Sequence, residues 1–300
     1  MSTAPLDPIT TSVVEHALAS VADEMATVMI ATAYSPLVRD LLDFTVALCN
    51  PNGEMVVQGL GMAIHLGALP TAIDAILRKF GHDMRPGDAI IMNDPYEGGM
   101  HLPNVIILTP AFAHGRLLGY ALAMAHHTDV GGHVPGSVPV NSRDVFGEGI
   151  RIPPMRLQRD GVRDETLLTL IERNTRLPRD FFGDLEAQLS ACRIGEKRLL
   201  AAVERYGEAI VLATMNGLLD RSERMARAQI SQWPDGEYGF EEFLDSDGMD
   251  GPPQRLKVTL RIDGDEITCD GTGTAPQVAT AINSPLAYSQ SAFYLCLRSV

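Results

Sequence analysis

The chain has 300 residues, of which 45% are hydrophobic and 21% are charged, as is usual for a globular protein. Its net charge of −14 argues against a nucleic-acid partner, because phosphate binding requires basic patches. It has no apolar run of about 18 or more residues, the length that a membrane span needs, and residues 1–11 do not resemble a signal peptide.

The first third of the chain predicts one long helix followed by short strands. Apolar residues recur at three- and four-residue steps over residues 8–33, and Ser35-Pro36 ends this helix, because a residue before proline avoids the helical region. Shorter elements are expected next: strands over residues 43–49 and 54–58 joined through Asn52-Gly53, a helix over residues 68–80, and an apolar strand over residues 88–92.

An apolar hairpin is predicted over residues 105–125, with its turn at His114-Gly115. Both arms are apolar on both faces, so we expect them inside a sheet that is covered on both sides. His101 and Asn104 precede the first arm, and His126 follows the second. Because opposite ends of a hairpin meet at one edge of the sheet, these side chains are expected to converge.

Five of the eight histidines fall between His101 and His133. The pair Gly98-Gly99 precedes His101 and lets the backbone pass close to another group. Imidazoles and carboxylates gathered beside glycines at strand ends are what a divalent metal site requires. The alternative is two turns whose histidines only cap backbone groups.

The second half of the chain predicts helices and then another sheet. A short helix is expected over residues 166–174, and one or two long helices over residues 180–232, with breaks possible at Gly195, Gly207 or Gly217. Strands over residues 238–244, 256–262 and 266–269 precede an apolar helix over residues 286–300 that has no cap. Four cysteines without C-x-x-C spacing, Cys49, Cys192, Cys269 and Cys296, predict buried free thiols and a cytoplasmic protein.

We therefore expect an α+β protein, in which a mixed sheet with long helices packed on it is followed by a second, incomplete β-rich region. Residues 1–160 would form an α/β domain with the metal site, and residues 161–234 a long helical segment. Residues 235–300 would begin a β-rich domain. The uncapped last helix favours truncation of that domain.

Several stretches, in this order along the chain, resemble the hydantoinase B family: S-P-L-V-R-D-L-L-D-F-T, G-D-A-I-I-M-N-D-P-Y-E-G-G-M-H-L-P-N-V, A-H-H-T-D-V-G-G, G-E-G-I-R-I-P-P, N-T-R-L-P-R-D-F-F-G-D-L-E-A-Q and D-G-T-G-T-A-P-Q-V-A-T-A-I-N-S-P. This family contains the B subunits of ATP-dependent N-methylhydantoinases, the matching half of 5-oxoprolinase, and the metal-carrying subunit of acetone carboxylases. Its members are usually much longer, so the chain resembles their N-terminal part.

The resemblance implies a single divalent metal, zinc, manganese or iron. Its ligands would be Asp40, His101, Asn104 and His126. Asn104 stands where the family usually has Asp, and an amide oxygen can coordinate a metal without bringing a charge. Three further residues, His127, Asp129 and Asp94, are candidates for orienting the ligands or carrying protons. A purely structural role is the alternative for His127.

The resemblance also implies a reaction in two steps on two subunits. A sugar-kinase-like A subunit would use ATP to phosphorylate the carbonyl oxygen of a cyclic amide or imide, and metal-assisted attack of water in this subunit would open the ring. The chain shows no ATP-binding motif of its own, since Asp270–Thr274 lacks the Lys of a P-loop. A cytoplasmic hetero-oligomer follows, without nucleic-acid or membrane partners.

Two alternatives to this function remain open. One is carboxylation of a phosphorylated enol, as in acetone carboxylase. The other is a catalytically impaired scaffold that only stabilises its partner.

Overall fold

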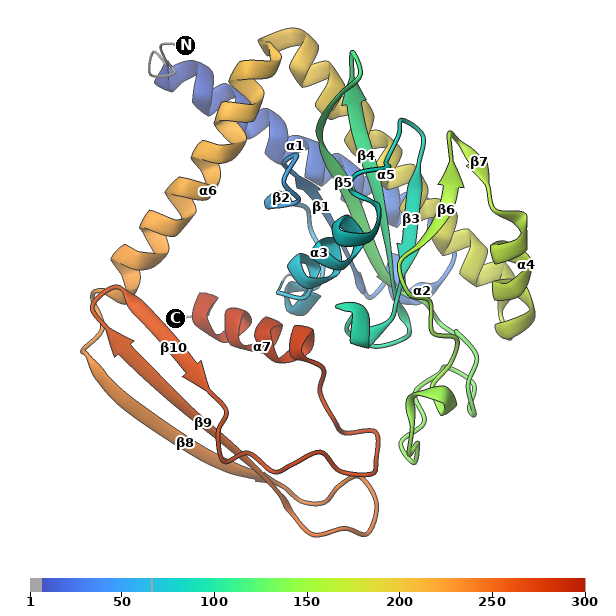
Figure 1. Cartoon of the computed structure of the whole chain (residues 1–300), viewed down its shortest axis with the longest axis vertical. Helices are drawn as coiled ribbons and strands as arrows, with labels where there is room; N and C mark the ends of the chain where they lie inside the picture. The colour runs from blue at the N-terminus through green and yellow to red at the C-terminus, as the bar shows by residue number, and fades with distance from the viewer. Residues whose placement is uncertain (1–6, 66, 300) are drawn as a thin grey trace.

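A large sheet forms the centre of the computed structural model, which describes residues 7–65 and 67–299 (Figure 1). Its strand order is β2-β1-β5-β4-β3-β6-β7. The strands are β1 (Phe44–Cys49), β2 (Met55–Gln58), β3 (Ala89–Met92), β4 (Asn104–Ala113), β5 (Arg116–His126), β6 (Met155–Arg159) and β7 (Val162–Arg163). Every pairing is antiparallel, where we expected a mixed sheet. The expected α+β class is confirmed.

Hydrophobic cores lie on both faces of this sheet. Helices α1 (Pro8–Thr32) and α5 (Pro178–Tyr206) cover one face, and α3 (Leu69–Phe80) covers the other (Figure 1). Along β4, Val105 and Ile107 face α1 and α5, whereas Ile106 and Leu108 face α3. Because both faces are buried, the central strands are apolar throughout, as the sequence predicted.

The hairpin of β4 and β5 is the middle of the sheet. Its turn residues His114 and Gly115 both have positive φ, 50° and 76°, as a tight hairpin turn requires. At the open end of the hairpin, Asn104 lies directly opposite His126. The predicted convergence of the hairpin ends is therefore confirmed.

Helix α6 (Glu208–Ile230) leads from the large sheet to the smaller one (Figure 1). The remaining helices are α2 (Pro36–Arg39), α4 (Glu165–Asn174) and α7 (Leu286–Arg298), with single turns η1 (Ala63–His65), η2 (Pro95–Glu97) and η3 (Val145–Gly147). Gly207, with φ of 88°, separates α5 from α6, while Gly195 and Gly217 lie inside these helices. The predicted break at Gly207 is thus confirmed.

The smaller sheet has the order β10-β9-β8, formed by β8 (Gly236–Leu244), β9 (Gln254–Asp263) and β10 (Glu266–Asp270). Helix α7 follows it and returns toward the large sheet (Figure 1). There Ser291 Oγ donates a hydrogen bond to the carbonyl of Ile64 and accepts one from the Gly67 amide, at 3.1 Å. The chain end therefore packs on the turn η1.

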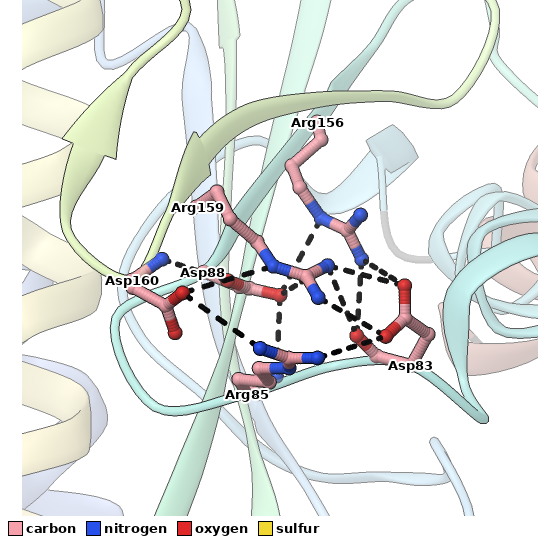
Figure 2. Close-up of polar contacts among 6 residues, drawn as sticks. All are labelled: Asp83, Arg85, Asp88, Arg156, Arg159 and Asp160. Atoms are coloured by element: carbon pink, nitrogen blue, oxygen red, sulfur yellow. Dashed lines mark hydrogen bonds and ion pairs between the residues drawn. The ribbon is translucent and has the colours of Figure 1, made fainter.

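Strands β6 and β7 were not expected from the sequence. Six charged side chains, Asp83, Arg85, Asp88, Arg156, Arg159 and Asp160, fasten β6 to the loop before β3 (Figure 2). The buried carboxylate of Asp88 accepts from the amides of Arg85, at 3.1 Å, and Asp160, at 3.0 Å. These ion pairs add to the backbone pairing of β6 with β3, and the mixed polar sequence of β6 explains why a search for apolar patterns does not find it.

None of the helices in the described part of the chain is long and apolar enough to cross a bilayer. Cys49 and Cys192 are buried, and burial raises the pKa of each thiol to about 12. Cys269 and Cys296 are exposed, so the expectation of buried thiols is wrong for these two.

Two glycines inside helices offer a matched test of the packing. A Cβ on Gly195 would lie 2.6 Å from Sδ of the fully buried Met25 and 3.0 Å from Cβ of Ala121, whereas a Cβ on Gly217 would meet nothing within 4 Å. We expect Gly195→Ala to lower the free energy of unfolding by about 1–3 kcal/mol through overpacking. Gly217→Ala should raise it by about 0.5–1 kcal/mol. Urea denaturation of both variants measures this, and equal effects would contradict the packing of α5 on α1.

Candidate functional site

A closed ring of five polar side chains lies at one end of the central strands. Its members are Asp43, His65, His101, Asn104 and His126. The neighbours in β4 and β5 with the same side-chain direction, such as Ile106 and Met124, belong to the core under α3. The ring is therefore on the α3 face of the sheet.

Each member of this polar ring contacts the next. Asp43 lies 3.4 Å from Nε2 of His65 and 3.7 Å from Nδ1 of His126. The amide of Asn104 bridges two imidazoles, since its Oδ1 lies 2.9 Å from His101 Nε2 and its Nδ2 lies 3.4 Å from His65 Nε2. The rings of His101 and His126, with centroids 4.9 Å apart, close the circle.

The sheet positions three of these side chains. Asp43 immediately precedes β1, and its carbonyl accepts from the His126 amide at 3.0 Å. His126 ends β5 and Asn104 begins β4, directly opposite each other. The other two come from outside the sheet: His65 from η1, and His101 from the loop before β4. A Cβ on Gly98 in that loop would lie 2.6 Å from the carbonyl oxygen of Thr71, so this close approach to α3 requires glycine.

Asp43, and not Asp40, is the acid beside the histidines. Asp40 ends α2 at the surface, where both of its carboxylate oxygens accept from Arg39 at 3.0 Å. Leu42 then adopts a left-handed backbone conformation, with φ of 57°, which is unusual for a leucine and turns the chain before Asp43. The prediction that Asp40 lies together with His101 and His126 is therefore wrong.

The three residues proposed for catalysis lie outside the polar ring. His127 is fully buried on the opposite face, where its Nε2 contacts Gln188 Oε1 at 2.9 Å and its ring packs on Phe181. This follows from strand geometry, because adjacent residues point to opposite faces. Asp129 accepts from Arg176 Nη1 at 3.0 Å and organises the loop after β5.

Asp94 has a structural setting of the same kind. Its Oδ1 accepts from the Tyr96 amide at 2.9 Å, which caps η2, and its Oδ2 lies 3.3 Å from Arg151 Nε. The carboxylate is buried and already satisfied by these two contacts.

His65 is the member of the polar ring that the sequence did not reveal. It lies in a single helical turn without hydrophobic periodicity, in which the carbonyl of its neighbour Ile64 accepts from Ser291, far along the chain. The only available signal was its position between two apolar segments shortly after β2, which many structural histidines share.

The ring keeps its imidazoles neutral at physiological pH. The pKa values of His65, His101 and His126 are each lowered to about 4, mainly by burial and further by a neighbouring imidazole. Burial raises the pKa of the Asp43 carboxyl, and His101 opposes this rise. Neutral imidazoles present lone pairs, which is the form that binds metals.

The chemistry of these donors fits a divalent metal, since three neutral imidazoles and a carboxylate suit zinc or iron. In the structure described for residues 7–65 and 67–299, however, no group of three or more His, Cys, Asp or Glu side chains is arranged closely enough to hold an ion. In this arrangement His101 Nε2 contacts Oδ1 of Asn104 at 2.9 Å.

The sequence matches a known protein family. The family model described as Hydantoinase B/oxoprolinase matches residues 7–300. The chain belongs to this family. It is 36% identical over 306 residues to the putative B subunit of the D-/L-hydantoinase of Pseudomonas sp. (strain NS671), covering 98% of this chain and 52% of that protein.

Solved structures show the same fold. The crystal structure of ATP-dependent caprolactamase from Pseudomonas jessenii matches with a TM-score of 0.93 and 34% identity, over 99% of this chain and 51% of that one. Acetone carboxylase in its nucleotide-free structure matches with a TM-score of 0.87 at 19% identity, over 98% of this chain and 41% of that one, which shows a shared fold. The chain thus spans about half the length of the hydantoinase relative that it matches.

The lowered imidazole pKa values make this hydantoinase B-type fold sensitive to acid. Between pH 6.5 and about 4 the unfolded histidines bind protons while the folded ones resist them, so the free energy of unfolding falls as the pH falls. We expect the melting temperature of chelator-treated protein to drop over this window, and His101→Gln to flatten the drop. The surface variant His82→Gln is the control. A His101→Gln profile parallel to that of the wild type would contradict the pKa directions.

Proposed function

We propose that the chain is the B subunit of an ATP-dependent cyclic amide hydrolase, in which a bound divalent metal assists ring opening after a partner subunit has phosphorylated the substrate. The observation that carries this proposal is the polar ring of three neutral imidazoles, one carboxylate and one amide. Membership of the hydantoinase B/oxoprolinase family supports it, as does the structural match to ATP-dependent caprolactamase.

His101, His126, Asp43 and the amide oxygen of Asn104 would hold the metal. The ion, when bound, supplies Lewis acidity and a readily deprotonated water. This chain would contribute the metal ligands and so determine their total charge. With one carboxylate and a neutral amide, the ligands carry a single negative charge. A divalent ion then leaves the centre positive, which favours an anionic, phosphorylated substrate.

The partner is proposed to be an A-type ATP-binding subunit. Two relatives are named as the B or beta subunit of their enzymes, which supports a hetero-oligomer. The free thiols, two of them exposed, support a reducing, cytoplasmic setting. An amide is a poor electrophile, so prior phosphorylation of its carbonyl oxygen gives the ring-opening step the better substrate that it needs.

Activity assays with the partner test this function. We expect ATP-dependent opening of a hydantoin, a lactam or 5-oxoproline by the assembled subunits, and none by this chain alone. Asp43→Asn should reduce the rate at least about 100-fold by removing the only negative donor, whereas Asp40→Asn, at the surface, should retain it. Hydrolysis by the isolated chain, or loss of activity in Asp40→Asn alone, would refute the proposal. A complex that forms but is inactive would favour the scaffold alternative.

The amide at position 104 sets the affinity for the metal. Asn104→Asp adds a second negative donor, so we expect metal to bind about 10-fold or more tightly after dialysis against a mild chelator. Metal analysis of the wild type, Asn104→Asp and His126→Ala measures this, with metal lost from the last. Equal metal content in the wild type and His126→Ala would show that the metal lies elsewhere.

A further inference from the structure

His65 is the most enclosed imidazole of the polar ring, with only 4% of its side chain exposed. Both of its ring nitrogens have polar neighbours. Nδ1 lies 3.3 Å from Thr45 Oγ1, and Nε2 lies 3.4 Å from both Asp43 Oδ1 and Asn104 Nδ2. These contacts determine which nitrogen carries the proton.

The hydroxyl of Thr45 fixes the tautomer. Its single proton has two backbone acceptors within reach, the carbonyl oxygens of Phe44 at 2.9 Å and Met62 at 3.2 Å. With that proton donated to a carbonyl, Thr45 Oγ1 accepts from Nδ1–H of His65. Nε2 is then the unprotonated nitrogen. The orientation of Asn104 agrees, because its NH2 group faces this lone pair and the sulfur of Met100.

Two electron-rich atoms therefore face each other inside the polar ring. The lone pair of His65 Nε2 lies 3.4 Å from the carboxylate oxygen of Asp43, and the NH2 group of Asn104, also at 3.4 Å, is the protein donor that faces it. The spacing suits a metal, since two ligand bonds of about 2.1 Å at a tetrahedral angle place their donor atoms roughly 3.4 Å apart. The carboxylate of Asp43 is partly exposed, so an ion can reach this point from solvent.

We propose that His65 is a metal donor of this site through Nε2, together with Asp43, His101 and His126. The inference rests on the metal centre of the proposed function and adds a ligand to it. Three imidazoles and one carboxylate favour zinc or iron over magnesium or calcium, which prefer oxygen ligands. Thr45 acts as a positioning residue that holds the tautomer. The neutral amide of Asn104 is then a supplementary donor. The site therefore persists although Asn stands at position 104 where the family usually has Asp.

Zinc affinity of the chelator-treated full chain tests the role of His65. Titration against a chromophoric chelator gives the dissociation constant for the wild type, His65→Ala, His65→Gln, Thr45→Val, His126→Ala and the surface control His82→Ala. We expect His65→Ala and His65→Gln to weaken zinc binding by more than about 100-fold, and Thr45→Val by about 10-fold, with His82→Ala unchanged. The visible spectrum of the cobalt-loaded protein, which reports the ligand set, should change in Thr45→Val and in both His65 variants.

The outcomes separate this inference from the proposed function. Circular dichroism melts of the metal-free variants establish that each is folded. If His65→Ala does not fold, His65→Gln replaces it in the test. A folded His65 variant could keep the wild-type zinc affinity and cobalt spectrum while His126→Ala loses binding. That result would overturn the role of His65 and leave the proposed metal centre intact. A proton rather than a metal would then lie between His65 and Asp43. A wild type that binds no zinc or cobalt would overturn both.

Discussion

The pairing of β4 with β5 is the constraint on which both the fold and the candidate site depend. Its register places Asn104 opposite His126 and divides the alternating side chains between two cores. A slip of one residue would exchange the two faces, sending His126 into the core under α5 and His127 into the polar ring. Gln188 opposes such a slip, because its Nε2 donates to the carbonyls of Val105 at 2.8 Å and Ala123 at 3.1 Å, one on each strand.

This constraint explains which parts of the site the sequence could predict. The convergence of His101, Asn104 and His126 follows from a hairpin whose arms are apolar and whose turn is marked by His114-Gly115, so local chemistry sufficed. Successive side chains of a strand point to opposite faces of the sheet, so the sequence also implies that only one of His126 and His127 can belong to the candidate site. For the fold, the same periodicities identified the helices and the central strands, with ends displaced by one or two residues.

What the sequence did not reveal depends on contacts without a local pattern. Asp40 and Asp43 both stand close before a strand, and the choice between them rests on the left-handed conformation of Leu42 and on the Arg39 pairing. His65 enters through a turn held by distant residues. Strand β6 is held by ion pairs around Asp88, and mixed polar sequence of this kind is also typical of loops.

The contact of Ser291 with the turn η1 gives the site an order of assembly. Gly67 and Ser291 are 224 residues apart, so this contact closes a very long loop, and such contacts form late in folding. During synthesis, β1 to β5 can pair long before α7 has left the ribosome, because chains fold from the N-terminal side as they emerge. Asp43, Asn104 and His126 can then come together before Ser291 contacts the turn that carries His65. The sheet can thus serve as a template on which the turn η1 is fastened later, when α7 packs against it.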